Sequence, residues 1–187
     1  GYKVMAASDS QGGIYNKNGL NIPDVIKHKA KTGKLQNFKN SKNISNEELL
    51  ELKTDVLVPA ALEDQIIKKN AGKINAKLIL EMANRPITPE ADNILLDKHI
   101  FVAPDILANA GGVVVSYFEW VQNSMNYYWS ETEVLEKLKA YMTNAVKELS
   151  KVCIDFKCDM RSSLYINAIR RILEAERLRG NVKKHSS

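Results

Sequence analysis

Short apolar runs alternate with segments of helical periodicity over the first two-thirds of the chain. Continuous apolar or β-branched runs predict strands at residues 3–8, 55–58, 77–80 and 100–103, with a further short strand at residues 14–15. Runs of this length without polar alternation are typical of strands that are covered on both faces. Strands that alternate with helices in this way indicate an α/β fold with a mostly parallel sheet.

Residues that favour helix ends stand between these strands. Side-chain acceptors at the start of a helix, proline in its first turn and glycine after its end are the signals we use. They predict helices from Asn21 to Lys31, from a capping box of Ser45 and Glu48, from Asp64 to Lys69, and from Thr88 through Pro89 to Lys98.

The pattern changes after Pro104, where apolar residues recur at helical spacing between Val134 and Val152. Asp159 can cap a last helix that runs from Met160 to Arg179. We therefore divide the chain into a Rossmann-like domain at residues 1–128 and a C-terminal helical extension at residues 129–187. Stripes of this kind are far more often core than cofactor contacts.

Composition excludes few function classes. The 187 residues carry a net charge of +5 and 44% apolar side chains, enough for a core. No apolar run approaches the roughly 20 residues that span a bilayer, the start does not resemble a secretion signal, and no basic helix suggests nucleic-acid binding. Cys153 and Cys158 are expected to be reduced thiols of a cytoplasmic protein. His28, His99 and His185 are scattered, so we expect no metal site.

Asp9 is the first candidate for chemistry, because ligands of open parallel sheets bind beyond the carboxyl ends of the strands. An acid at the end of the second strand of a Rossmann unit can accept hydrogen bonds from an adenosine ribose. A glycine-rich phosphate loop should precede that acid by about 20 residues. Only eight residues precede Asp9. Either the fold is not a Rossmann unit, or the sequence lacks the first strand and its loop. Alone, such an aspartate is more often a turn residue.

Three further segments follow predicted strands. Small residues from Pro59 to Glu63 would let a flat ligand approach the backbone, although an ordinary turn explains them equally well. Asn84 can bind a ribose hydroxyl or stabilise a turn. The run from Asn109 to Gly112 precedes an apolar helix, so its backbone N–H groups can face a ligand. Ser116 lies two helical turns after Asn109, but serines in such runs often bond to a carbonyl one turn back.

The chain resembles glutamate dehydrogenases over nearly its whole length. The blocks that carry the resemblance occur in family order: Ala7 to Ser10 with Gly12 to Tyr15, Asn46 to Leu50, Pro59 to Glu63, Ala83-Asn84 with Thr88 to Asp92, Pro104 to Trp120, and Asp159 to Arg161. The resemblance implies reversible oxidative deamination of L-glutamate to 2-oxoglutarate and ammonia, with hydride transfer to NAD or NADP. It also implies a hexamer, assembled largely through a domain that this sequence lacks.

The resemblance assigns roles to particular residues. It places Asp9 and Ser10 at the adenosine ribose and Asn109 at the nicotinamide carboxamide and the substrate. It places Ser116 at the γ-carboxylate of the substrate, and lines the nicotinamide ribose with Ala60, Ala61 and Asn84. The family's catalytic lysine and aspartate belong to the domain that the sequence lacks. We therefore expect no catalytic residue in this chain and no activity of the chain alone.

Two positions depart from the family pattern. Met82 and Arg85 replace glycines beside the expected cofactor path, where added side chains could crowd a dinucleotide. The residues leave the choice between NAD and NADP open. Asp9 favours a free 2′-hydroxyl, whereas Ser8, Ser10 and Lys17 could accommodate a phosphate.

Two other functions fit the same residues. A leucine- or phenylalanine-type dehydrogenase would need an apolar pocket where Ser116 stands, so the hydroxyl argues against it. The second alternative is a non-catalytic fragment that binds a nucleotide or acts only as an interaction module.

Overall fold

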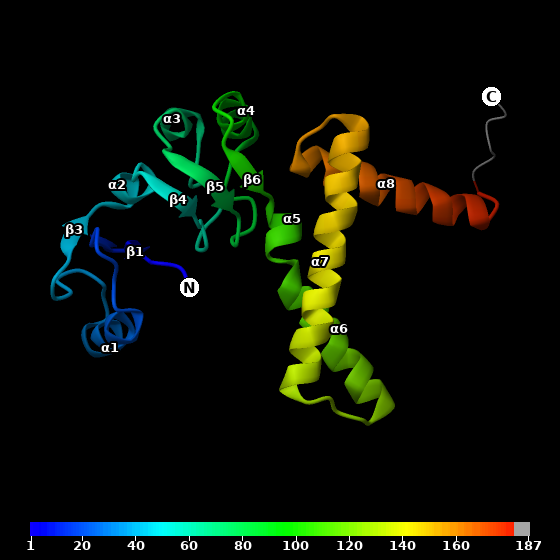
Figure 1. The fold of residues 1–187 in the computed structure, drawn as a ribbon, viewed down its shortest axis with the longest axis horizontal. Coiled ribbons are helices and arrows are strands. Elements are labelled where there is room, and N and C mark those ends of the chain that lie inside the picture. The colour runs from blue at the N-terminus through cyan, green and yellow to red at the C-terminus, as the bar shows by residue number, and fades with distance from the viewer. Residues whose placement is uncertain (182–187) are drawn as a thin grey trace.

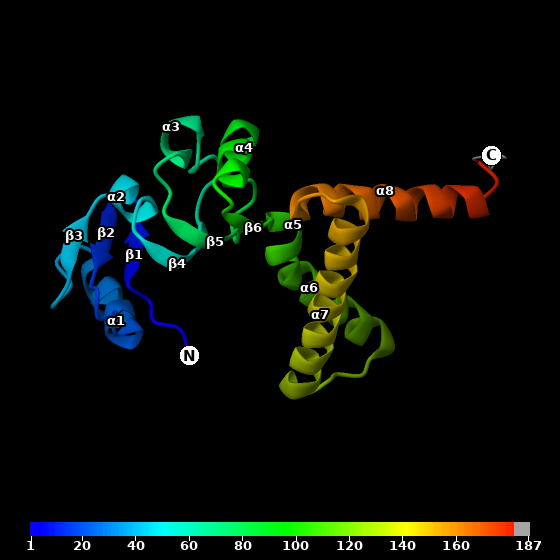
Figure 2. The ribbon, with the colours of Figure 1, turned by 45° about the horizontal axis from the view of Figure 1, so that its top comes forward.

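The computed structural model describes residues 1–181, which form two small sheets followed by a group of helices (Figures 1 and 2). His185 lies outside the described residues. The elements in chain order are β1 (Ala6–Asp9), β2 (Gly12–Tyr15), α1 (Ile22–Thr32), β3 (Lys42–Ile44), α2 (Asn46–Leu50), β4 (Thr54–Leu57), α3 (Lys68–Ala71), β5 (Ala76–Leu80), α4 (Pro89–Asp97), β6 (Phe101–Ala103), α5 (Asp105–Ala108), α6 (Ala110–Met125), α7 (Glu131–Phe156) and α8 (Met160–Leu178).

The predicted α/β class is confirmed, but the strands form two sheets. Strands β4, β5 and β6 are parallel neighbours, whereas β1, β2 and β3 form a separate antiparallel sheet. The expectation that the strand before Asp9 joins the parallel sheet was therefore wrong. Only Ser10 and Gln11 connect β1 to β2, and so short a connection joins antiparallel strands. A parallel pair needs a crossover of a dozen or more residues.

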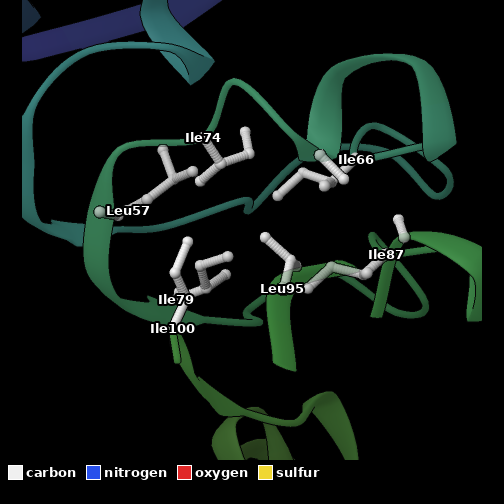
Figure 3. Close-up of a cluster of buried hydrophobic side chains, with 10 residues drawn as sticks. Leu57, Ile66, Ile74, Ile79, Ile87, Leu95 and Ile100 are labelled. Atoms are coloured by element: carbon white, nitrogen blue, oxygen red, sulfur yellow. The ribbon is translucent and has the colours of Figure 1, made fainter. Parts of the chain in front are cut away.

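The main core lies between one face of the parallel sheet and helices α3 and α4 (Figure 3). It is almost entirely aliphatic and is made by Leu57, Ile66, Ala71, Ile74, Ala76, Ile79, Ile87, Ala91, Leu95 and Ile100. A smaller cluster of Ile14, Val25 and Leu35 holds helix α1 against the antiparallel sheet. In the main core, the apolar strands supply Leu57, Ala76 and Ile79, and the helices and connecting segments supply the other residues.

The opposite face of the parallel sheet has no such cover in residues 1–181. Val56, Leu78 and Phe101 are aligned across the three strands by their register. The Phe101 side chain is 53% exposed. The prediction that both faces are covered therefore holds for one face within the described residues.

The helix boundaries that rest on local capping are confirmed. Helix α1 has Asn21 at its start and Gly33 in the left-handed region at its end. Ser45 and Glu48 form the predicted capping box of α2. Thr88 caps α4 and Asp159 caps α8, each by accepting a backbone N–H bond from the first turn.

The helix predicted from Asp64 to Lys69 was wrong, because only residues 68–71 are helical. Ile66 instead forms an isolated parallel bridge with Ile87. The Asp64 N–H donates to the carbonyl of Arg85 at 2.9 Å. The Ile66 carbonyl accepts from the Thr88 N–H at 3.0 Å. A helix over these residues would need that carbonyl as an acceptor for one of its own N–H groups.

The last third of the chain is helical, as predicted. Helix α7 packs against both α6 and α8, and α8 reaches back to the edge of the sheet at β6. Figures 1 and 2 show α8 extending from the sheet toward the C-terminus. The buried ring of Phe118 meets Trp129 and Tyr141 edge to face, with centroids 5.6 Å apart in both pairs. Aromatic contacts of this geometry hold α6 against α7.

No described helix is long and apolar enough to cross a membrane. Within residues 1–181, no group of three His, Cys, Asp or Glu side chains is arranged to hold a metal ion. Cys153 and Cys158 are both free thiols.

Leu95→Ala tests the assignment of the core. Leu95 is fully buried between α4 and the sheet, whereas its neighbour Leu96 is 55% exposed on the same helix. We expect Leu95→Ala to lower the free energy of unfolding by about 2–5 kcal/mol and Leu96→Ala by less than about 0.5 kcal/mol. Urea unfolding of the 187-residue chain, followed by circular dichroism, measures both. Equal losses would contradict the assigned face of α4.

Candidate functional site

The carboxyl ends of β4, β5 and β6 meet at one edge of the parallel sheet. The N–H groups of Met82 and Ala83 both donate to the carbonyl of Pro59, at 3.0 and 2.9 Å. The Glu81 N–H donates to the carbonyl of Ala103 at 3.1 Å. These bonds bring together the three loops that were predicted from the sequence to bind a ligand.

Asn84 and Asn109 are in direct contact at this edge. The Asn109 amide nitrogen donates to the Asn84 side-chain oxygen at 2.8 Å and lies 3.5 Å from the carbonyl oxygen of Met82. Asn109 stands between α5 and α6, and its side chain caps neither helix. Asn84 is exposed. The predicted pair of polar side chains is thus assembled, with amide groups open to a ligand.

The N-terminus of α6 opens beside Asn109. Gly111 and Gly112 belong to the first turn of this helix. The Gly112 N–H makes a long bond of 3.4 Å to the Asn109 carbonyl, and the other N–H groups of a first turn have no partner within the helix. A Cβ atom at Gly112 would have no heavy atom within 4 Å, and one at Gly111 would lie 3.7 Å from Leu138. The glycines therefore leave room beside donors that carry the positive end of the helix dipole.

Ser116 lies on the same helix, two turns further on, and is exposed. The hydroxyls of Ser124 and Ser150 donate to carbonyls one turn back, at 2.9 and 2.8 Å. For Ser116, no such bond forms within residues 1–181. Its hydroxyl is therefore free for a ligand, and the bond that usually satisfies a helical serine is not made here.

Asp9 ends β1 of the antiparallel sheet, and Ser10 lies in the turn between β1 and β2. Gln11 N–H donates to one Asp9 carboxylate oxygen at 2.9 Å, and the Lys29 ammonium donates to the other at 3.0 Å. The Gln11 bond lowers the pKa of Asp9 most; partial burial opposes the shift, and Lys29 reinforces it. Asp9 is thus an ionised turn residue with a cation beside it.

Asn46, which was not predicted as a site residue, joins α2 to the Asp9 turn. Its amide nitrogen donates to the Asp9 carbonyl at 3.1 Å. Its side-chain oxygen is buried and has no partner in residues 1–181. The residue could be found from sequence only as part of the family block from Asn46 to Leu50.

A second missed group is the ion cluster around Arg161. Its guanidinium donates to Glu81 at 2.7 Å and to Asp92 at 2.6 Å, and lies 3.6 Å from Asp105. Burial raises the pKa of Glu81 despite the bonds from Arg161 and the Asp105 N–H. Burial opposes charge on Arg161, but its bonds to Glu81 and Asp92 raise its pKa. The family block Asp159 to Arg161 was the available signal.

Arg85 shows why one of the family's glycines is useful at this edge. Its φ is 45°, in the left-handed region that glycine adopts without cost. The Arg85 guanidinium reaches Glu63 at 3.2 Å and Asp64 at 3.4 Å, but the Arg85 side chain is 65% exposed. Exposed ion pairs of this kind contribute little stability.

The arrangement can orient a flat, polar ligand. Exposed Ala60 and Ala61 present little side-chain bulk, the two asparagine amides supply donors and acceptors, and the start of α6 supplies N–H groups. Ser116 adds a hydroxyl further along the helix.

Comparison with known proteins identifies the family. The model of the Glutamate/Leucine/Phenylalanine/Valine dehydrogenase family matches residues 1–180. The chain belongs to this family. Curated relatives include a glutamate dehydrogenase of Thermotoga maritima, 48% identical over 180 residues, which cover 96% of this chain and 43% of that protein.

Two further members of the family differ in their named cofactor. The NADP-specific glutamate dehydrogenase of Synechocystis is 47% identical, covering 96% of this chain and 44% of its own. The catabolic NAD-specific glutamate dehydrogenase of Bacillus subtilis is also 47% identical, covering 96% and 42%. The chain thus spans less than half the length of the curated relatives it matches.

Solved structures of the family agree with the fold. The hetero-hexameric glutamate dehydrogenase of Thermus thermophilus, in its leucine-bound form, superposes with a TM-score of 0.89 at 33% identity. The match covers 97% of this chain and 42% of that one. The Rossmann-like interpretation and the resemblance stated from sequence are therefore confirmed.

Arg85→Gly and Arg85→Ala form a matched test of the left-handed backbone. Both remove the exposed ion pairs with Glu63 and Asp64, but only glycine relieves the positive φ. We expect Arg85→Gly to be more stable than Arg85→Ala by about 1 kcal/mol, the lower end of the cost of this conformation in other residues. Urea unfolding of the two variants gives the difference. A more stable alanine variant would show that the loop does not hold this backbone.

Proposed function

We propose that this chain is the cofactor-binding half of a glutamate dehydrogenase, which oxidatively deaminates L-glutamate to 2-oxoglutarate and ammonia. The observation that carries the proposal is the Asn84–Asn109 contact beside the open N-terminus of α6, with the free Ser116 hydroxyl two turns on. This arrangement offers amide groups to a nicotinamide end and a hydroxyl to the far end of a substrate. It is also the point at which the family resemblance is most specific.

The described residues fit a nicotinamide cofactor at the sheet edge. Nothing lies within 4 Å of the place where a Gly112 Cβ would stand, and Ala60, Ala61 and Asn84 are exposed along the neighbouring loops. We assign these three residues to the nicotinamide ribose and Asn109 to the carboxamide and the substrate edge. Asp9 and Ser10 are assigned to the adenosine ribose. Hydride acceptance is the chemistry that the cofactor supplies when it is bound.

We assign substrate selection to Ser116. Its hydroxyl would donate to the γ-carboxylate of glutamate, an interaction that an apolar amino acid cannot make. Asn109 directly precedes the helix that carries Ser116, so the two residues keep a fixed spacing along one substrate. A free hydroxyl in this place favours glutamate over leucine or phenylalanine, whose side chains offer it no acceptor.

The cofactor is proposed as NAD or NADP. Asp9 supports NAD, because a carboxylate accepts from a free 2′-hydroxyl and repels a phosphate. Lys29 stands 3.0 Å from that carboxylate and reduces the repulsion. The two relatives that are named for NADP and for NAD are equally similar to this chain.

The proposal also covers the domain division, the oligomeric state and the location of the enzyme. We assign residues 1–128 to the cofactor-binding domain and residues 129–187 to a helical extension, within a complete protein that forms a hexamer. The free thiols of Cys153 and Cys158 support a cytoplasmic location. No nucleic-acid or membrane partner is proposed.

Ser116→Ala in the complete enzyme tests the substrate assignment. A charge-assisted hydrogen bond contributes roughly 1.5–3 kcal/mol. Its loss should lower kcat/KM for glutamate by about 10- to 150-fold. Norvaline lacks the γ-carboxylate and should be much less affected.

Ser124→Ala is the matched control, because Ser124 lies on the same helix and, within residues 1–181, its hydroxyl bonds only to the Trp120 carbonyl. Ser124→Ala should leave kcat/KM nearly unchanged for both glutamate and norvaline. If Ser116→Ala lowers kcat/KM equally for glutamate and norvaline, Ser116 is a structural residue and the substrate assignment fails.

The polypeptide of residues 1–187 should bind the cofactor weakly. Its sequence has no G-x-G-x-x-G turn, the element that supplies most pyrophosphate contacts in a Rossmann site. With ribose and nicotinamide contacts alone, we expect a Kd on the order of millimolar, near −4 kcal/mol, and no glutamate turnover. Calorimetry with NAD and NADP measures the first, and an absorbance assay the second. Micromolar binding would reveal a phosphate site elsewhere in these residues.

A further inference from the structure

Arg161 holds three acids that come from three different elements. Glu81 follows β5 and is fully buried, Asp92 lies in α4, and Asp105 begins α5. Arg161 itself stands in the first turn of α8, far along the chain, and donates to Glu81 at 2.7 Å and to Asp92 at 2.6 Å. A single guanidinium with donors in a planar fork can serve several carboxylates in this way, whereas an ammonium is a point charge.

Two of these acids are bonded directly to the loops of the candidate site. The second Glu81 oxygen accepts from the Asp105 N–H at 2.7 Å, which ties the start of α5 to the end of β5. The second Asp105 oxygen accepts from the Arg85 N–H at 2.8 Å. Glu81 and Arg85 therefore bracket the segment that carries Asn84.

Asn109 is fixed from the same side. It follows α5 directly, and its N–H donates to the Asp105 carbonyl at 3.0 Å. Asn109 is thus bonded to the backbone of Asp105, and Asn84 is the chain neighbour of Arg85, whose N–H bonds to the Asp105 carboxylate. Asp92 differs, because no described hydrogen bond links its side chain to either loop.

Building on the proposed function, we propose that Arg161 is a positioning residue for the reaction. Through Glu81 and Asp105 it sets the spacing of Asn84 and Asn109, and so of the nicotinamide and the substrate between them. Its link to Asp92 serves stability alone. Arg161 has no contact with the reacting groups in this role and acts only through the two loops.

The asymmetry between the acids allows a sharp test. Arg161→Lys in the complete enzyme keeps the charge but loses the fork that reaches Glu81 and Asp105. Asp92→Asn disturbs only the link to α4. Arg171→Gln is the matched control on the same helix, since it breaks an exposed pair with Glu148, 2.7 Å long. Steady-state kinetics with glutamate, thermal unfolding and the side-chain amide NMR signals of Asn84 and Asn109 are recorded for each.

If Arg161 is a positioning residue, Arg161→Lys should change kcat and the amide signals, whereas Asp92→Asn should change only Tm. Arg161→Lys should lower kcat by about 10-fold or more, since a misplacement near 1 Å can cost up to 100-fold. It should also shift the asparagine amide signals. Asp92→Asn should lower Tm while leaving kcat and those signals close to wild type, and Arg171→Gln should change neither. If Arg161→Lys cannot be purified, Glu81→Gln weakens the same link at constant shape and should reproduce the fall in kcat.

Other outcomes overturn one proposal or the other. If Arg161→Lys and Asp92→Asn lose stability alike and retain wild-type kcat and amide signals, Arg161 is a structural residue. If the wild-type enzyme does not turn over glutamate, the proposed function fails. The amide signals of the 187-residue chain then decide the role of Arg161 independently of activity.

Discussion

The buried carboxylate of Glu81 is the point on which the second half of the structure depends. It lies at 0% exposure and has two kinds of partner: the Arg161 guanidinium from α8 and the Asp105 N–H from α5. A buried carboxylate without partners is strongly unfavourable, and removal of one partner of such a pair typically costs about 3–5 kcal/mol. The position of α8 and the start of α5 are therefore fixed by one requirement, that this charge be matched.

That requirement explains why features far apart in the chain arrive together. Helix α8 contacts the sheet at β6, and its first turn must lie there for Arg161 to reach Glu81. The loops after β5 and β6 are then held by hydrogen bonds to the same acids. Exposed loops are usually the most mobile parts of a fold. Hydrogen bonds to these buried acids are what can hold the Asn84 and Asn109 side chains in fixed positions.

Contacts between residues close together in the chain were predictable from the sequence, and contacts between distant residues were not. The caps at Asn21, Ser45, Thr88 and Asp159 depend on residues within one turn, so their identities determine them. The segment around Ile66 was mistaken for a helix, because its bridge to Ile87 involves a partner 21 positions away. The rule that ligands bind beyond the carboxyl ends of parallel strands pointed to Asn84 and Asn109, since the ends of the apolar runs mark the ends of the strands. Nothing in the spacing of residues linked Arg161 to Glu81, and only the family block pointed to it.

The two departures from the family pattern have different physical consequences. At position 85 the backbone is left-handed, so glycine there is favoured by conformation, and an arginine must tolerate φ of 45°. Met82 is not among the described residues with positive φ, so no such cost arises there. Its side chain is partly exposed beside the loop, and its carbonyl lies within 3.5 Å of the Asn109 amide. Backbone conformation therefore does not explain a glycine at position 82, and under the proposed function its role is to leave space for the cofactor. The two replacements should accordingly act on different quantities, position 85 on loop stability and position 82 on the room left for the cofactor.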